Sequence, residues 1–259
     1  MSSIAVEQSA APTSRFALLW RYRELTWMLA WRDIRVRYKH TLLGAAWAVA
    51  PPLMTMFIFT FIFGTVVGIE KSRLTGSDSI PYALFALAGL VPWMFFANGL
   101  SSAVSSLTAN RQLVTKIYFP REVFPLASVM SAVVDFAVSM LALLGLGIYL
   151  HFNGAWAFQI HPAIAWLPLV IAVQLVLMIG LSFLLSMANL YYRDVGLIFR
   201  SFIQLNPMTP IIRAYRDCLI TGQAPIDASF VGAAVTSIGI LMVGWSWFRH
   251  CEFDFAEHI

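Results

Sequence analysis

The residues that could do chemistry in this 259-residue chain are few, and the most prominent is Asp135. It is the one ionisable residue deep inside a long apolar segment, 14 residues past Arg121, or ~21 Å of helix rise. A charge at that depth is costly unless it faces the bundle interior, water or a hydrogen-bonding partner. Asp135 therefore either bonds a neighbouring helix or lines a substrate path. Asn98, Gln174 and Asn189 are weaker cases of the same kind.

No catalytic or metal-binding constellation is visible in the sequence. The five histidines lie in loops or at the ends of apolar segments and form no His-x-x-x-His pair: His40, His151, His161, His250 and His258. Cys218 and Cys251 are far apart and have no metal-ligand spacing. No Gly-x-x-x-x-Gly-Lys loop is present, so Mg-ATP must be bound by another protein. We expect no cofactor and no metal in this chain.

A basic loop at 110–121 is a second candidate for function. It mixes charged and apolar side chains in a way that suits docking on a partner surface: Arg111, Lys116, Ile117, Tyr118, Phe119 and Arg121. The alternative is that the loop only satisfies the preference for positive charge on the cytoplasmic side.

Residues 16–39 are predicted to form a basic amphipathic helix. Leu18, Tyr22, Leu25 and Leu29 form one apolar stripe, with Trp27, Trp31, Ile34 and Tyr38 beside it. Its cationic side chains would point toward anionic headgroups: Arg32, Arg35, Arg37 and Lys39. The helix either anchors the first span or helps to present an anionic or lipid-linked substrate.

Long uncharged segments define the elements that hold these residues. No Asp, Glu, Lys or Arg occurs in four runs: 41–69, 79–110, 136–192 and 228–248. A bilayer core of about 30 Å needs ~20 apolar residues in a helix. With 59% hydrophobic and 12% charged residues, the chain is predicted to be a polytopic membrane protein. The predicted spans are 41–69, 81–109, 123–150, 163–190 and 228–248.

The charge distribution predicts orientation. Seven Arg and Lys residues lie between Arg15 and Lys39, which places the N-terminus and the 110–121 loop in the cytoplasm. Segment 191–228 is ambiguous, because its prolines suggest broken or re-entrant helices rather than a plain span. The charge rule does not decide on which side the C-terminus lies.

Several blocks of sequence resemble one transporter family. The blocks are WRDIRVRYKHTLLGAAWAVAPPLMTMFIFTFIFG (31–64), PYALFALAGLVPWMFFANGL (81–100), NRQLVTKIYFPREVFPLASV (110–129), YYRDV (191–195) and LNPMTPIIRAYRDCL (205–219). Together they resemble the ABC type-2 permeases of bacterial polysaccharide exporters, which move O-antigen, capsule or teichoic acid. The N-x-x-L-V-x-K-x-Y-F-P-R-E pattern is the most specific of them.

The resemblance implies an all-α permease of six spans that forms a homodimer with two copies of a separate ATPase in the bacterial inner membrane. Its substrate would be a polyprenyl-diphosphate-linked polysaccharide, O-antigen in particular; membrane lipids would surround it and no nucleic acid would bind. The ATPase would contact a coupling loop: Arg111, Lys116, Ile117, Tyr118, Phe119, Arg121 and Glu122. Aromatic candidates for stacking on sugars in the channel are Tyr38, Trp47, Trp93, Phe95, Phe96 and Tyr118. The alternative for each of them is a place in the interfacial aromatic belt.

The resemblance also sets the expected domain layout. Residues 1–15 would be a disordered N-terminus, 16–39 the interfacial helix, 40–250 the transmembrane domain and 251–259 a tail. Between YRDV and LNP the family carries a longer fifth crossing than this chain does, so an incomplete or re-entrant span is expected at 195–226. We expect that an internal segment is missing, because a permease without that crossing would invert its C-terminus.

Three other functions fit the sequence less well. A type-2 permease for a drug or another lipid should lack the specific 110–122 pattern. A stand-alone secondary transporter should show internal repeats and paired intramembrane charges. An enzyme acting on lipid-linked sugars should show clustered acidic residues or histidines near one membrane face.

Overall fold

The computed structural model describes residues 19–39, 46–63, 80–116, 120–156, 161–191 and 207–254, and these ranges contain helices and no strand. Four of the helices are long and apolar enough to cross a membrane: Tyr82–Ala109, Val123–Phe152, Pro162–Leu190 and Ala228–His250. A shorter apolar helix spans Trp47–Phe61. The prediction of an all-α polytopic membrane protein is confirmed.

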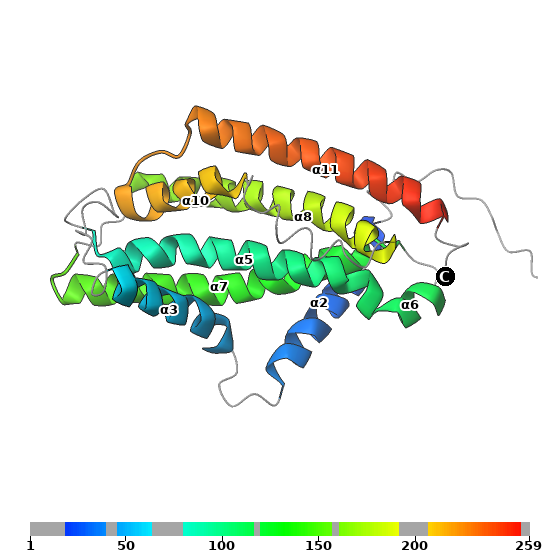
Figure 1. Cartoon of the computed structure of the whole chain (residues 1–259), viewed down its shortest axis with the longest axis horizontal. Helices are drawn as coiled ribbons and strands as arrows, with labels where there is room; N and C mark the ends of the chain where they lie inside the picture. The colour runs from blue at the N-terminus through cyan, green and yellow to red at the C-terminus, as the bar shows by residue number, and fades with distance from the viewer. Residues whose placement is uncertain are drawn as a thin grey trace, which may run out of the picture.

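The long helices α5, α7, α8 and α11 lie side by side in a bundle, and the shorter helices lie along its sides and ends (Figure 1). In chain order they are α2 (Arg23–Tyr38), α3 (Ala46–Phe61), α5 (Tyr82–Ala109), α6 (Arg111–Lys116), α7 (Val123–Phe152), the 3-10 helix η2 (Pro162–Trp166), α8 (Leu167–Tyr191), α10 (Met208–Arg216), the π-helical turn η3 (Asp217–Thr221) and α11 (Ala228–Asp254).

Helix α5 lies at the centre of the bundle. It packs antiparallel to α7, where the rings of Phe95 and Phe136 stack at 4.6 Å between centroids. It runs parallel to α8, whose Gln174 amide donates a hydrogen bond to the Pro92 carbonyl at 2.8 Å. Gln174 is buried, and this bond gives its NH2 group a partner, while its Oε1 has none among the described residues. Its predicted role as a polar group within the span is therefore structural.

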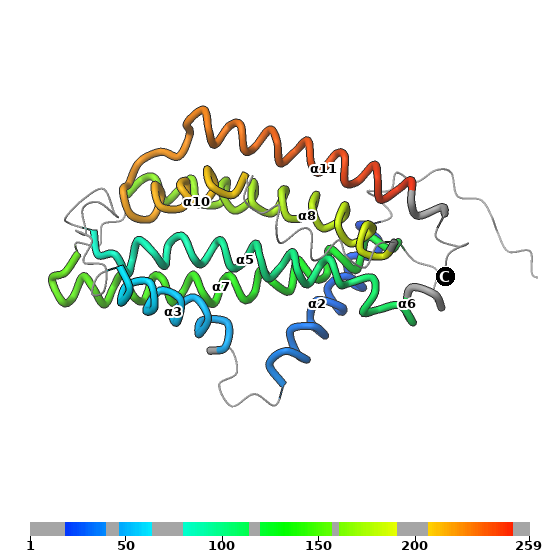
Figure 2. Tube along the Cα trace, viewed as in Figure 1, coloured from blue at the N-terminus to red at the C-terminus, as the bar shows by residue number. Residues whose placement is uncertain are grey.

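Helices α8 and α11 run side by side in the same direction (Figure 2). Two glycines allow the close approach: a Cβ on Gly180 would lie 2.7 Å from the backbone of Leu241, and one on Gly244 would collide with the Gly180 carbonyl. Because the two helices are parallel, the end of α8 and the start of α11 lie at opposite ends of the bundle. Residues 192–227 therefore return the chain across it.

This return corrects the expectation about the C-terminus. The short connection does not invert it: α11 ends at the same end of the bundle as α8 and α6 (Figure 1). Within the connection, α10 packs against α5, α8 and α11 near the end where α11 begins. Among the described helices, α5, α7, α8 and α11 run along the bundle; residues 192–206 lie outside the described residues, so the missing segment stays a prediction.

Helix α2 packs more closely on the bundle than an interfacial anchor would. Leu29 and Ala30 are buried in a cluster with Val123, Phe124 and Ala127 at the start of α7, and Ile34 is buried as well. Trp27 and Trp31 stack on each other with centroids 6.2 Å apart and remain about half exposed. The helix thus buries Leu29, Ala30 and Ile34 and turns its tryptophans outward; its place at the membrane interface stays a prediction.

Candidate functional site

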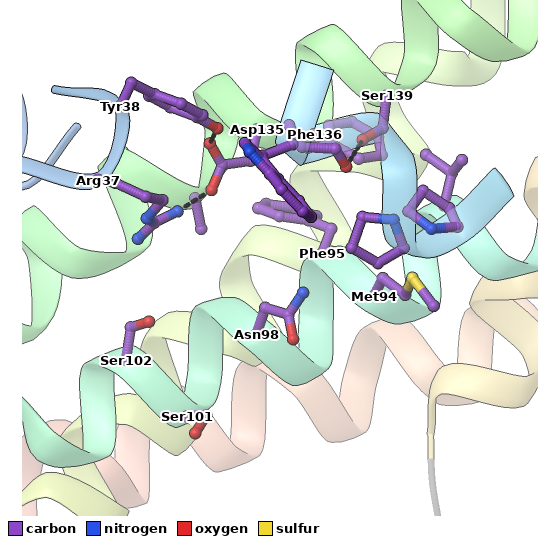
Figure 3. Close-up of a pocket in the computed structure, with 16 residues that line it drawn as sticks. Arg37, Tyr38, Met94, Phe95, Asn98, Ser101, Ser102, Asp135, Phe136 and Ser139 are labelled. Atoms are coloured by element: carbon purple, nitrogen blue, oxygen red, sulfur yellow. Dashed lines mark hydrogen bonds and ion pairs between the residues drawn. The ribbon is translucent and has the colours of Figure 1, made fainter. Parts of the chain in front are cut away.

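A cavity of about 370 Å³ lies among the end of α2, α3, α5 and α7 (Figure 3). We call it the central cavity, because Asp135 on its wall is the thirteenth of thirty residues in α7. Aromatic rings, hydroxyl groups, an amide and one ion pair line it. A polar cavity at this depth is unusual in an apolar bundle and marks a candidate for binding or passage.

Asp135 is held by two residues at the end of α2. Arg37 forms an ion pair with one carboxylate oxygen, and the Tyr38 hydroxyl donates a hydrogen bond to the other (Figure 3). The side chain of Asp135 is 23% exposed and that of Arg37 is 37% exposed. The pair is thus partly open to the cavity, and the intramembrane charge is compensated by a helix that precedes it by almost a hundred residues.

A polar stripe of α5 continues from the cavity toward α6. Its members recur at helical spacing on one face: Asn98, Ser101, Ser102, Ser105 and Thr108. Asn98, Ser101 and Ser102 line the cavity, and Ser105 and Thr108 are exposed beyond it. Several of these hydroxyls donate to backbone carbonyls of the preceding turn, as for Thr108 and Ser105 O at 2.9 Å. A small, polar face of this kind suits contact with water or a polar solute.

Two prolines shape the α3 wall of the cavity. Pro52 has no N–H and cannot donate to the carbonyl of Ala48 one turn earlier. The hydroxyl of Ser139 on α7 donates to that carbonyl instead, at 3.1 Å. Pro51 likewise leaves the Trp47 carbonyl without its helical donor. The Ser139 bond fixes α3 against α7 and so holds Trp47 at the cavity.

The structure brings together six of the residues predicted from the sequence. Arg37, Tyr38, Trp47, Phe95, Asn98 and Asp135 all line the central cavity. Two other aromatic candidates lie elsewhere. Phe96 is 1% exposed in the core of the bundle, so within this chain it has no free face for a sugar. Trp93 lines a separate cavity near the other end of α3.

The other basic residues predicted for the interfacial helix lie away from the central cavity. Arg32 donates to Asp33 at 2.8 Å and to the Asn110 side chain at 2.9 Å, which ties α2 to the end of α5. The guanidinium of Arg35 lies 6.0 Å from the Trp31 ring. Lys39 is exposed. Only Arg37 of this set reaches the central cavity.

The predicted coupling loop is described in part. Arg111 begins the short helix α6 and is exposed, but Ile117, Tyr118, Phe119 and the side chain of Lys116 lie outside the described residues. Arg121 is half-buried, and Glu122 is 1% exposed at the start of α7. Glu122 is therefore enclosed by its own chain and does not offer a surface to a partner.

Sequence reasoning missed the serines of the cavity and the hydroxyl that supports α3. The spacing of Asn98, Ser101 and Ser105 was visible, and applying the helical period to polar residues would have found it. Among the described residues, no three His, Cys, Asp or Glu side chains are grouped so that they could hold a metal ion.

Comparisons with known proteins agree with this architecture. Two permeases named O-antigen export system permease protein RfbA from Klebsiella pneumoniae are 28% and 26% identical, each over 87% of this chain and 91% of the relative. One of the same name from Myxococcus xanthus is 25% identical over 93% of this chain and 97% of the relative.

The family described as ABC-2 type transporter matches residues 24–206. That range includes α2, α3, α5, α7 and α8, and so the whole wall of the central cavity. The prediction of a permease rather than an enzyme is confirmed by this match. The chain belongs to the ABC-2 type transporter family.

Proposed function

We propose that this protein is the membrane permease of an ABC exporter for lipid-linked polysaccharide, with O-antigen as the substrate class. The observation that carries the proposal is similarity over most of both chains to permeases named for O-antigen export. The bacterial inner membrane is the proposed location, with the N-terminus and α6 on the cytoplasmic side.

The central cavity supports this function. A glycan presents hydroxyl groups on its edges and apolar C–H groups on its ring faces. Asn98, Ser101 and Ser102 offer hydrogen bonds along one wall, and Trp47 and Tyr38 offer ring surfaces on another. A wall of small hydroxyl side chains can contact successive sugars without holding any of them tightly, which transport of a polymer requires.

ATP hydrolysis would come from a separate subunit that binds Mg-ATP. We propose that it contacts the region of α6 and the 110–121 loop, where Arg111 is exposed. We leave Glu122 out of the proposed contact with the ATPase, because its side chain is buried. We further propose a dimer of this chain with two ATPases, and a polyprenyl diphosphate as the lipid carrier of the polymer.

The decisive experiment is to co-express the chain with the ATPase encoded beside it and to reconstitute the purified complex in vesicles. A complex of two copies of each subunit, whose ATP hydrolysis rises with lipid-linked glycan, is the expected result. A permease that purifies alone and transports under a proton gradient would overturn the proposal.

A variant pair tests the polar wall within the same assay. Ser101→Phe places a ring on the polar stripe and should reduce export at least tenfold without loss of the complex. Leu141→Phe adds a ring at a position on α7 that is 68% exposed and should leave export unchanged. Equal export by both variants would remove the α5 stripe from the pathway.

A further inference from the structure

A second cavity, of about 430 Å³, lies at the other end of α3, between α3, α5 and α10. We call it the Arg216 cavity. Five aromatic side chains and one arginine dominate its lining: Phe59, Phe63, Tyr82, Phe85, Trp93 and Arg216. The roles derived above for the central cavity use none of these residues.

Among the described residues, the guanidinium of Arg216 forms no ion pair in this cavity. Its Cζ lies 3.8 Å from the centroid of the Phe85 ring, and its Nε donates to the Phe85 carbonyl at 3.3 Å. Among the described residues, it makes no other hydrogen bond and no ion pair. An arginine has five N–H donors, so four remain for a ligand or solvent.

The nearby carboxylates are engaged with another arginine. Asp217 and Asp227 lie 3.9 and 3.8 Å from Arg213 in two ion pairs. Asp227 also accepts a hydrogen bond from the backbone N–H of Phe230 at the start of α11. Asp217 attracts the guanidinium of Arg216 at longer range, but within the part of the chain that the structure describes neither acid forms an ion pair with Arg216.

Helix α5 is shaped to receive this side chain. A Cβ on Gly89 would lie 3.0 Å from the Arg216 Cζ and 3.3 Å from its Nε, closer than van der Waals contact allows. Glycine inside a helix is less favourable than alanine by about 1 kcal/mol. Because Gly89 has no side chain, the guanidinium of Arg216 can lie directly against helix α5.

The depth of Arg216 indicates the kind of ligand. With 28 residues, α5 is about 42 Å long and exceeds a 30 Å hydrocarbon core by about 6 Å at each end. Phe85 and Gly89 lie about 5–10 Å from its first residue, Tyr82. Arg216 is thus at the level where lipid phosphates meet acyl chains, beside aromatic rings that favour the same level.

We propose that the Arg216 cavity binds the phosphate group of a lipid. A guanidinium with free N–H groups pairs with phosphate oxygens through charge-assisted, bidentate hydrogen bonds. The surrounding rings exclude water and accept the apolar chain next to the phosphate. Two sources share this chemistry, a membrane phospholipid and a polyprenyl diphosphate carrier. This inference does not depend on the proposal that the protein exports a polysaccharide.

Native mass spectrometry of the intact purified protein tests the proposal with four probe lipids. Phosphatidic acid is compared with the matching diacylglycerol, and undecaprenyl diphosphate with undecaprenol. We expect the two phosphate-bearing lipids to bind at least tenfold more tightly than their neutral analogues. The tighter of the two phosphate lipids identifies the source.

Three variants assign the binding to the arginine. Gly89→Ala keeps the charge but displaces the guanidinium, and should weaken phosphate-lipid binding about tenfold, which corresponds to 1.4 kcal/mol. Arg216→Met should abolish the preference, and Arg216→Lys, which retains a point charge, should give an intermediate value. Gly145→Ala, where a Cβ meets nothing within 4 Å, is the matched control.

The outcomes separate this proposal from the one above. Phosphate-lipid binding that is unchanged in Gly89→Ala and Arg216→Lys, or neutral lipids that bind as well as phosphate lipids, would overturn the inference even if Arg216→Met fails to fold. Export measured in the same variants tests the permease separately: loss of binding with normal export would leave the proposed function standing.

Discussion

At the scale of single residues, the ion pair between Arg37 and Asp135 joins the end of α2 to the middle of α7. Each charge is costly at this depth alone, and each satisfies the other. Removing one partner leaves the other exposed to a poorly solvated cavity.

We expect Asp135→Asn to lower the free energy of unfolding by about 1–3 kcal/mol, less than for a fully buried pair because both side chains are partly exposed. The double variant Arg37→Gln/Asp135→Asn should recover part of this loss. Thermal unfolding of the four proteins in one detergent gives the coupling energy as a double-mutant cycle. Additive losses would show that the two charges do not interact.

The bond between Ser139 and the Ala48 carbonyl gives a second prediction. Ser139→Ala should cost about 1 kcal/mol, because it leaves that carbonyl without a donor. In a Pro52→Ala background the backbone N–H of residue 52 can donate to the same carbonyl, so the effect of Ser139→Ala should shrink. Unfolding measured with and without proline at 52 tests this; equal losses in the two backgrounds would contradict it.

The sequence showed that Asp135 places a charge inside a predicted span, but it did not show which residue compensates that charge. Hydropathy locates a charge within a span, because it depends only on local composition. The partner, Arg37, is 98 residues away, and only the packing of α2 along α7 brings the two together. The same holds for Phe96, whose aromatic type suggested a sugar contact while its place in the core decides otherwise.

At the scale of elements, the contact between α8 and α11 depends on two glycines. We expect Gly244→Ala to destabilise the protein by about 1–3 kcal/mol, because the new methyl group would force the helices apart. Gly239→Ala lies on the same helix, where a Cβ meets nothing within 4 Å, and should be neutral or stabilising. Thermal unfolding of both proteins is the measurement; similar melting temperatures would show that the close approach is unimportant.

The long spans could be predicted from the sequence, and the short elements could not. Charge-free runs gave α5, α7, α8 and α11 to within a few residues, because a long apolar helix has no alternative in a bilayer. The described part of the first span, α3, covers only Ala46–Phe61 of the predicted 41–69. Helix α10 has an amphipathic pattern with arginines on one side, and its position against α5 and α8 follows from tertiary packing.

At the scale of the whole molecule, the parallel arrangement of α8 and α11 fixes the parity of the topology. We expect a green fluorescent protein fused to the C-terminus to fluoresce and alkaline phosphatase at the same place to be inactive, because both report a cytoplasmic end. Phosphatase inserted at Gly154, in the loop after α7, should be active. An active C-terminal phosphatase would show that residues 192–227 do not cross the membrane.

The early position of α2 also has a consequence for biogenesis. Inserting an aspartate at the centre of a membrane helix costs about 2.5–3.5 kcal/mol at the translocon. The apolar residues of α7 offset that cost, and Arg37 has already been synthesised when Asp135 leaves the ribosome. The polypeptide thus makes the counter-ion before it makes the charge.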